Sequence, residues 1–372
     1  MIPFNKPYLT GKEVEYLIEA VSSGKISGNG SFTKKCQHFF EQQFNFKKTL
    51  LTTSCTDALE MAAILIDIQP NDEVIVPSYT FVSTANPFVL RGAKIVFADS
   101  QEGHPNIDPE KLEQLITPKT KAIVPVHYAG IACDMDNIMQ LAKIYNLFVI
   151  EDAAQGIDSY YKGNPLGGIG HLGTFSFHET KNLNCGEGGL LIINEEKFIK
   201  RAEIIWEKGT NRVEFHRGEV NKYGWVDIGS SFLPSEIVAA YLYAQINNLE
   251  NIQKKRKWIW NYYNENLSSI RNLIEFPLIP NYATNNGHLF YLIMENIKQR
   301  QAFLDHLKNK GILSVFHYQS LHNSPFYHSK HDSRDLLNAD KYSQQLVRLP
   351  LFYELTEKEL HYIVITIKDF FQ

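Results

Sequence analysis

Lys181 follows a short apolar run and precedes a glycine cluster, within the stretch TFSFHETKNLNCGEGGLL that spans residues 174–191. The run over residues 174–178 has the composition of a β-strand, so the lysine is expected where a buried strand ends. Partial removal from water destabilises the charged form of a lysine and so lowers the pKa of its amine. More of the amine is then uncharged, and the uncharged amine attacks carbonyl groups. The pattern indicates an amine that forms a Schiff base with an aldehyde. A lysine in a surface loop is the alternative.

Asp152 and Gln155 supply groups that one aldehyde cofactor, pyridoxal 5'-phosphate (PLP), requires. Asp152 ends the apolar run LFVIED over residues 147–152, and a carboxylate beside the ring nitrogen of PLP keeps that nitrogen protonated. The segment between Asp152 and Lys181 is long enough for a hairpin-like loop and one more strand, so both side chains can face one pocket. Gln155 is placed to hydrogen-bond the 3'-oxygen of the ring. The alternative for Asp152 is a cap on the following helix.

The phosphate and the ring of PLP also find candidate partners. The stretch LLTTSCTDALEMAAILI over residues 50–66 predicts a strand end, a Ser/Thr turn and a helix that begins near Thr56. Free N–H groups at a helix N-terminus bind phosphate, and the hydroxyls of Ser54 and Thr56 can add to them. Phe81 follows another strand and offers a flat apolar cover for the ring. Ordinary helix capping and a core phenylalanine are the alternatives for these two features.

Two other motifs in this neighbourhood suggest chemistry that their context excludes. Residues 168–173, GIGHLG, match a dinucleotide-binding fingerprint, but a loop precedes them and a strand follows, which is the reverse of the required strand–turn–helix order. His178 and Glu179 begin a metalloprotease-like motif, but position 182 is asparagine and the second zinc ligand is lacking. The chain also contains no G-x-S-x-G nucleophile elbow.

The elements that must position these residues alternate between strand-like and helix-like segments. Short β-branched runs occupy residues 73–78, 94–99, 121–128, 147–152, 174–178 and 189–194, and residues 134–146 have helical spacing. This alternation predicts an α/β fold with a mainly parallel sheet between helices, and ligands bind beyond the carboxyl ends of such strands. After about residue 235 a long helical stretch to 267, strands over 288–294 and 312–318, and a helix over 299–312 predict a smaller α+β domain. The predicted domains are residues 1–245 and 246–372.

Composition narrows the class of protein further. The chain has 372 residues, 44% hydrophobic and 21% charged, and a formal net charge of −4, which gives no general attraction to nucleic acid or acidic lipid. The basic run at residues 254–257 is interpreted as the solvated face of a helix whose aromatic residues turn inward. The four cysteines have no Cys-x-x-Cys spacing, which argues against disulfides and a zinc site. We expect a cytoplasmic protein without a signal peptide, a membrane span or a metal.

Several blocks together identify a resemblance that no single motif establishes. PSYTFVSTAN, VPVHYAG, VIEDAAQG, SFHETKN and GEGG resemble the sugar-nucleotide aminotransferase family of fold-type I PLP enzymes, and the similarity runs from IPFNKP to RLPLFY. The resemblance implies that Lys181 carries PLP and moves protons, that Asp152 pairs with the ring nitrogen, and that Gln155 and Phe81 contact the ring. The phosphate contacts that it implies are Ser54, Cys55, Thr56 and Ser176.

The resemblance also implies a homodimer whose active sites lie between subunits. In many members of the family an asparagine of the second subunit reaches the phosphate, and the matching position here is Ser231. Some relatives carry histidine in place of the PLP lysine and act as dehydratases, so Lys181 favours transamination.

The implied reaction converts dTDP-4-dehydro-6-deoxy-D-glucose and L-glutamate into dTDP-4-amino-4,6-dideoxy-D-galactose and 2-oxoglutarate, as a step in surface-polysaccharide or lipopolysaccharide biosynthesis. The alternatives are a related aminotransferase that makes the 4-amino-4,6-dideoxyglucose epimer or a 3-amino sugar, a PLP-bound regulatory protein without turnover, and a purely structural protein. His317 and His322 are candidate contacts to the sugar nucleotide.

Overall fold

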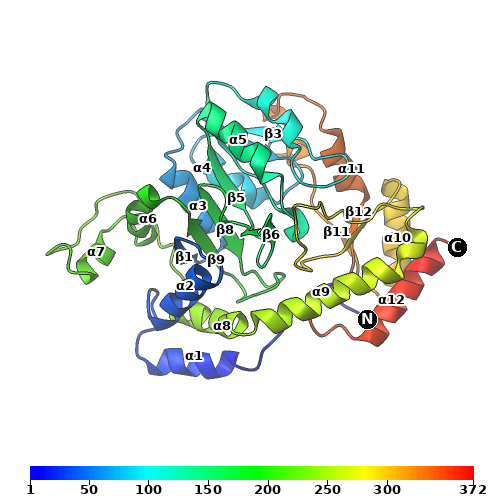
Figure 1. The fold of residues 1–372 in the computed structure, drawn as a ribbon, viewed down its shortest axis with the longest axis horizontal. Helices are drawn as coiled ribbons and strands as arrows, with labels where there is room; N and C mark the ends of the chain where they lie inside the picture. Colours follow the sequence, from blue (N-terminus) through cyan, green and yellow to red (C-terminus); the bar gives the residue numbers. More distant parts are fainter.

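The computed structural model describes residues 1–372, and its centre is a seven-stranded sheet in the order β1-β9-β8-β5-β4-β2-β3 (Figure 1). The strands are β1 (Lys48–Thr52), β2 (Glu73–Pro77), β3 (Lys94–Ala98), β4 (Thr120–Ile123), β5 (Phe148–Asp152), β8 (Leu172–Ser176) and β9 (Gly189–Ile193). Only β9 is antiparallel to its neighbours, and the other six strands run in one direction. The sheet is therefore mainly parallel, as the sequence predicts.

Helices cover both faces of this sheet, which explains why its strands are almost continuously apolar. In β2, Val74 and Val76 belong to one hydrophobic core and Ile75 belongs to the other. The first core packs against α3 (Cys55–Leu65), α4 (Asn86–Leu90) and α6 (Ile199–Trp206); the second packs against α1 (Glu13–Ser22), α2 (Ser31–Gln43), α5 (Met135–Tyr145) and α8 (Glu236–Ile246). Burial of both faces fixes where each strand ends and hence where the loops that follow the strands lie.

The C-terminal part has its own sheet and core. The antiparallel sheet has the order β10-β12-β11, and the helices around it pack into a third core of 21 buried residues that begins at Ile259. Its elements are α9 (Leu249–Asn266), β10 (Tyr291–Ile293), α10 (Ile297–Asn309), β11 (Val315–Phe316), α11 (Leu337–Gln345), β12 (Leu346–Arg348) and α12 (Glu357–Phe370). The predicted boundary after residue 245 falls in the last turn of α8 and remains a prediction.

Several predicted elements are shorter or divided in the structure. The helical stretch over 235–267 is two helices, because α8 ends at Ile246 and α9 begins at Leu249. The strand predicted to reach residue 128 ends earlier, since Pro125 has no N–H to continue the ladder after Val124 donates to Ile75 O (2.9 Å). The strands predicted over 288–294 and 312–318 are confined to β10 and β11. Sheet pairing, rather than apolar composition, limits them.

Two smaller features frame the loops of the large sheet. A hairpin of β6 (Tyr160–Tyr161) and β7 (Asn164–Pro165) lies between β5 and β8, as the spacing between Asp152 and Lys181 predicts. A segment containing α7 (Arg212–His216) projects from the body of the molecule (Figure 1) and is closed at its base by bridges between Thr210 and Trp225 and between Glu207 and Ser231. None of the helices combines the length and the apolar character that crossing a membrane requires.

Candidate active site

A cavity of about 760 Å³ lies beyond the carboxyl ends of the parallel strands β1, β2, β4, β5 and β8. The C-terminal part and the N-terminal residues Phe4 and Asn5 close its other side. Its walls include eight of the nine predicted site residues: Ser54, Cys55, Thr56, Phe81, Asp152, Gln155, Ser176 and Lys181. Crevices at this end of a parallel sheet are the usual ligand sites of α/β folds.

Lys181 lies in the turn after β8, where its backbone N–H donates to the carbonyl oxygen of His178 (2.9 Å). Removal from water is the main influence on the side-chain amine and lowers its pKa; the opposite effects of Cys55 and Asp152 are smaller, and the charge of Arg348 lowers the pKa further. A lowered pKa makes the neutral, nucleophilic amine more accessible near neutral pH. The site therefore suits an amine that attacks a carbonyl group.

Asp152 ends β5 and is 6% exposed, with both carboxylate oxygens engaged. Oδ2 accepts a hydrogen bond from the Thr84 hydroxyl (2.7 Å), and Oδ1 accepts one from the backbone N–H of Ala154 (3.2 Å). The Thr84 hydroxyl is in turn 2.7 Å from the Thr80 hydroxyl. Because an ionised carboxylate only accepts, Thr84 donates to Asp152 and Thr80 donates to Thr84. This chain fixes the orientation of the carboxylate.

The amide of Gln155 is also held from both ends. Its Oε1 accepts from the N–H of Ala129 (2.7 Å), a residue with a positive φ of 59°, and its Nε2 donates to the Tyr318 hydroxyl (3.1 Å). A primary amide has two N–H donors, so one hydrogen remains for a ligand in the cavity. This is the donor that the predicted contact with the 3'-oxygen needs.

The N-terminus of α3 opens into the cavity, where Ser54, Cys55 and Thr56 line its wall. The first amides of this helix, at Cys55 and Thr56, have no intrahelical acceptor, and the helix dipole favours a negative charge there. The Thr56 hydroxyl donates to Ser83 (2.9 Å), and Ser176 ends the neighbouring strand β8. Gly189 permits the close approach of β9, since a Cβ there would lie 2.4 Å from the backbone nitrogen of Cys55. Gly189 thus helps to form this end of the cavity.

Ser54 shows where capping and phosphate binding compete. Its Oγ accepts from the N–H of Asp57 (3.0 Å) and donates to the carboxylate of Asp57 (2.9 Å), so its hydroxyl already caps α3. The capping alternative is therefore correct for the Ser54 hydroxyl. The free backbone N–H groups of Cys55 and Thr56 remain available to an anion whether or not Ser54 caps the helix.

The Cys55 thiol ionises less readily than an ordinary thiol, because burial, reinforced by Asp152, raises its pKa to about 12.

Phe81 is 55% exposed, lines the cavity, and its ring centroid lies 6.2 Å from that of Tyr318. A core residue would be buried, whereas the Phe81 ring is exposed in the cavity, so the core alternative for Phe81 is wrong.

Ser231 is exposed and is not among the residues that line the cavity of its own chain. The predicted role of Ser231 concerns a second subunit and stays a prediction.

A model of the DegT/DnrJ/EryC1/StrS aminotransferase family matches residues 7–368. The chain belongs to this family. Among its relatives, the spore coat polysaccharide biosynthesis protein SpsC of Bacillus subtilis is 32% identical over 99% of this chain and 96% of that protein. The GDP-perosamine synthase of Escherichia coli O157:H7 is 31% identical over 100% of this chain and 98% of that enzyme.

Solved structures agree with this assignment. The putative sugar aminotransferase Spr1654 from Streptococcus pneumoniae, in its PMP form, is 28% identical with a TM-score of 0.91 over 100% of this chain and 99% of that chain. Its PLP form has a TM-score of 0.90 over 99% and 98% of the two chains. The predictions of a fold-type I α/β enzyme and of a PLP-dependent sugar aminotransferase are thereby confirmed.

The aminotransferase contains cavity residues that the sequence did not single out. Arg256 lies within the basic run of residues 254–257, yet it is 4% exposed and lines the cavity, so the interpretation of that run as a solvated face is wrong for this residue. Arg348 and His288 also line the cavity. Of the two candidate histidines, His317 lines it, whereas His322 packs against Ser78 with Nδ1 2.7 Å from the hydroxyl.

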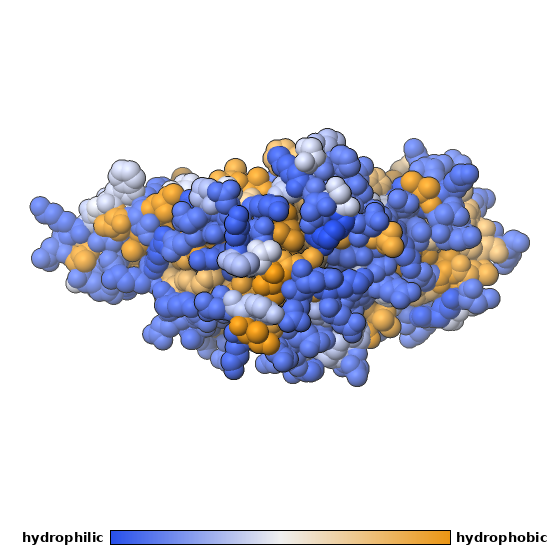
Figure 2. Space-filling view, turned by 90° about the horizontal axis from the view of Figure 1, so that it is seen from above, coloured by the Kyte–Doolittle hydropathy of each residue, from blue (hydrophilic) through white to orange (hydrophobic).

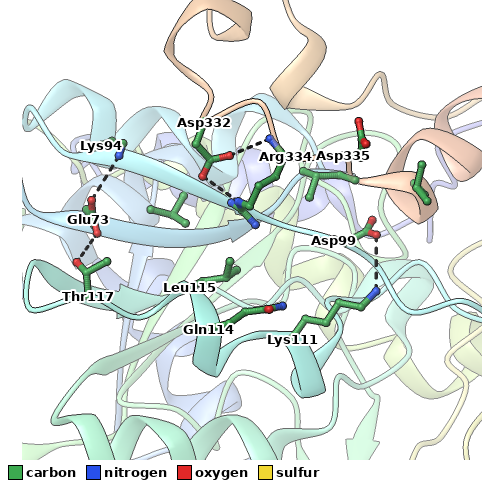
Figure 3. A pocket seen from close by; sticks show the side chains of 13 residues that line it. Glu73, Lys94, Asp99, Lys111, Gln114, Leu115, Thr117, Asp332, Arg334 and Asp335 are labelled. Carbon is green, nitrogen blue, oxygen red and sulfur yellow. Dashed lines mark hydrogen bonds and ion pairs between the residues drawn. The ribbon is translucent and has the colours of Figure 1, made fainter.

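A second cavity of the aminotransferase, of about 520 Å³, lies beside β2 and β3 and contains none of the predicted site residues. Each of its basic side chains pairs with a carboxylate (Figure 3): Lys94 with Glu73 (3.5 Å), Lys111 with Asp99 (4.0 Å) and Arg334 with Asp332 (2.9 Å). These pairs neutralise the cations, so this cavity does not resemble a site for an anionic ligand.

Replacing Phe81 with alanine is expected to weaken PLP binding to the aminotransferase about fivefold, because aromatic stacking contributes about 1 kcal/mol. The dissociation constant is measured by titrating apoenzyme with PLP. Val82→Ala is the matched control, since Val82 is 45% exposed but does not line the cavity. Equal affinities of the two variants would contradict a stacking role for Phe81.

Proposed function

We propose that this sugar aminotransferase transfers the amino group of L-glutamate to C4 of dTDP-4-dehydro-6-deoxy-D-glucose, giving dTDP-4-amino-4,6-dideoxy-D-galactose and 2-oxoglutarate. The observation that carries the proposed chemistry is that Lys181, in the turn after β8, and Asp152, at the end of β5, line one cavity together with the N-terminus of α3. These three features match the aldehyde, the ring nitrogen and the phosphate of PLP.

The residues present fit the cofactor. When bound, PLP supplies an electron sink that stabilises negative charge at the carbon from which a proton is removed. Lys181 Nζ would hold the cofactor covalently and then, once displaced by the amino donor, would take the proton from the Cα of the donor. The Asp152 carboxylate would accept a hydrogen bond from the ring nitrogen and keep it protonated. Amides of α3, with Thr56 and Ser176, would bind the phosphate.

The identity of the sugar nucleotide rests on extended sequence blocks. PVHYAG, GHLGTFSFHETKN, EKGTNR and DIGSSFLPS resemble dTDP-4-amino-4,6-dideoxygalactose transaminase without interruption. The similarity to a GDP-perosamine synthase makes a GDP-linked 4-keto sugar the specific rival. SpsC, a relative named for spore coat polysaccharide biosynthesis, supports a product that enters a surface polysaccharide.

The test supplies the purified holoenzyme with L-glutamate and, separately, the dTDP-linked or the GDP-linked 4-keto-6-deoxy sugar. We expect 2-oxoglutarate in equal amount to the amino sugar only with the dTDP-linked substrate, and NMR of the product should show an axial amine at C4. An equatorial amine would identify the glucose epimer, and an amine at C3 would identify the other family activity. Preference for the GDP-linked sugar would refute the substrate but not the reaction. PLP binding without any 2-oxoglutarate would favour the regulatory alternative.

We further propose that the enzyme works as a homodimer in which the partner subunit's Ser231 reaches the phosphate. The projecting segment around α7 supports this, because several of its large apolar side chains are exposed, Trp225 by 84%. Hydrophobic patches interrupt the hydrophilic surface at the end of the molecule where α7 lies (left in Figure 2). Large exposed apolar patches mark association surfaces. Sedimentation velocity should give a dimer, and a monomer with full activity would refute the shared site.

We also place the enzyme in the cytoplasm. The support is that all four cysteines are free, which suits a reducing compartment.

A further inference from the structure

The glycine-rich turn that precedes β8 surrounds the side chain of Glu151. The backbone N–H of Gly167 donates to Oε2 (2.9 Å), and those of Ile169 and Gly170 donate to Oε1 (2.7 and 2.6 Å). Backbone N–H groups that converge in this way form a site for an anion. The motif of residues 168–173 thus resembles a phosphate-binding fingerprint for a physical reason, but the anion that its turn binds is a buried side chain of the same chain.

The fourth hydrogen bond of Glu151 comes from His127, and both side chains are fully buried. Nε2 of His127 lies 2.9 Å from Oε2 of Glu151, and its Nδ1 accepts from the backbone N–H of Cys133 (3.1 Å). Because Nδ1 accepts, the single hydrogen of the neutral imidazole is on Nε2 and is donated to Glu151. All four partners of the carboxylate are therefore donors. A buried carboxylate without a cation depends on each of its hydrogen bonds.

The same histidine also binds the residue that follows Glu151. The backbone N–H of His127 donates to the carbonyl oxygen of Asp152 (3.2 Å), and the N–H of Asp152 donates to Pro125 O (2.9 Å). Successive side chains of a strand point to opposite faces of the sheet, so Glu151 lies in the turn before β8 while Asp152 lines the cavity. His127 thus holds the end of β5 on one face with its side chain and along the strand with its backbone.

Gln155 depends on the turn that begins at His127. The bond from the N–H of Cys133 to Nδ1 of His127 joins the two ends of the turn over residues 127–133. Within this turn Ala129, with a φ of 59°, donates its N–H to Oε1 of Gln155 (2.7 Å). Asp152 and Gln155 are the two polar groups assigned to the ring of PLP, and the position of each is fixed by one turn.

We propose that His127, through its hydrogen bond to Glu151, is a positioning residue for the ring of PLP. Neither side chain lines the cavity, so both act through Asp152 and Gln155. The inference rests on the proposed contact between Asp152 and the ring nitrogen. Without the Nε2 donor, a buried carboxylate has one partner fewer and the turn is released from β5. The Asp152 carboxylate then shifts from the ring nitrogen, and shifts of about 0.5 Å already matter at such contacts.

The test compares the binding of PLP to the full-length apoenzyme with that of its deaza analogue, in which a CH group replaces the ring nitrogen. Only PLP can donate from the ring to Asp152, so the ratio of the two dissociation constants reports this contact. A general loss of stability changes both constants alike. His127→Asn keeps an acceptor for the N–H of Cys133 but lacks the donor to Glu151, and we expect it to reduce the preference for PLP about tenfold. His127→Gln keeps a donor toward Glu151 and should retain most of the preference.

His171→Asn is the matched control. Nδ1 of His171 also accepts from a backbone N–H, that of Val149 (2.9 Å), and its Nε2 lies 3.8 Å from Glu195, but His171 does not line the cavity. An unchanged preference in His127→Asn, or an equal loss in His171→Asn, would overturn the proposal. If Asp152→Asn also leaves the preference unchanged, the role of Asp152 fails and the inference fails with it. If Asp152→Asn alone reduces the preference, only the role of His127 fails.

A second measurement keeps the proposal falsifiable if His127→Asn does not fold. NMR of the apoenzyme containing histidine labelled at its ring nitrogens distinguishes a protonated from an unprotonated nitrogen. The signal that is missing in His127→Gln identifies His127 in the wild-type spectrum. We expect a neutral ring with its hydrogen on Nε2. A hydrogen on Nδ1, or on both nitrogens, would overturn the proposal, because His127 could not then accept from Cys133 while donating to Glu151.

Discussion

Replacing Lys181 with alanine is expected to abolish transamination, with a loss of at least about five orders of magnitude in rate. No other amine lines the cavity, because Lys181 is its only lysine. In the proposed mechanism Lys181 provides both the covalent link to PLP and the base that removes the proton from the donor, so the variant is expected to lose both roles together. The anion site at α3 and the carboxylate of Asp152 remain, and PLP should still bind noncovalently.

Three measurements check this result: the rate of 2-oxoglutarate release, the visible absorption band of the holoenzyme, and mass spectrometry of the Lys181 peptide after borohydride reduction. The wild-type peptide should carry the reduced cofactor and the variant should carry none. Lys257→Ala is a suitable control, since Lys257 pairs with Asp158 (2.8 Å) and does not line the cavity. An active Lys181→Ala variant that keeps the absorption band would show that another group holds the cofactor.

The sequence predicts the large sheet well because its strands are buried on both faces. Val74, Ile75 and Val76 must all be apolar, since alternate residues face different cores. Such a continuous run is visible without knowledge of its neighbours. The small sheet is less predictable, because β10 and β11 owe their short lengths to pairing with the distant strand β12. Local composition contains no information about that pairing.

The difference between local sequence patterns and distant contacts also explains which site residues can be predicted from the sequence. Asp152 ends one predicted strand, and Lys181 and Ser54 follow two others. Because the carboxyl ends of parallel strands meet at one edge of a sheet, the sequence alone predicts that these residues lie together. Arg256 and Arg348 reach the cavity only because the C-terminal part closes over it. Arg256 also lies in a run of charged residues that is typical of an exposed helix, and no local signal marks its burial. Thr84 is likewise hidden, since its contact with Asp152 spans 68 positions.

Replacing Asp152 with asparagine is expected to leave the enzyme folded but to lower its rate about 1000-fold, which corresponds to about 4 kcal/mol of barrier. Asparagine has the same shape, and its oxygen can accept from Thr84 or from the N–H of Ala154, so the cost to stability should be only about 1–2 kcal/mol. It carries no negative charge, however, and no longer holds the ring nitrogen of PLP protonated. The cofactor then accepts electrons poorly, although it still binds.

The comparison with Thr84→Val separates charge from orientation at Asp152. Valine removes the hydroxyl that donates to Oδ2 but leaves the carboxylate in place, so we expect a loss of only about tenfold, the effect of one hydrogen bond to a charged group. Thermal unfolding and PLP affinity should show that both variants are folded and loaded. The rate of the absorbance change with L-glutamate then measures the chemical step. Near-normal activity of Asp152→Asn would mean that another group protonates the ring. Equal losses in the two variants would mean that Asp152 acts through its position alone.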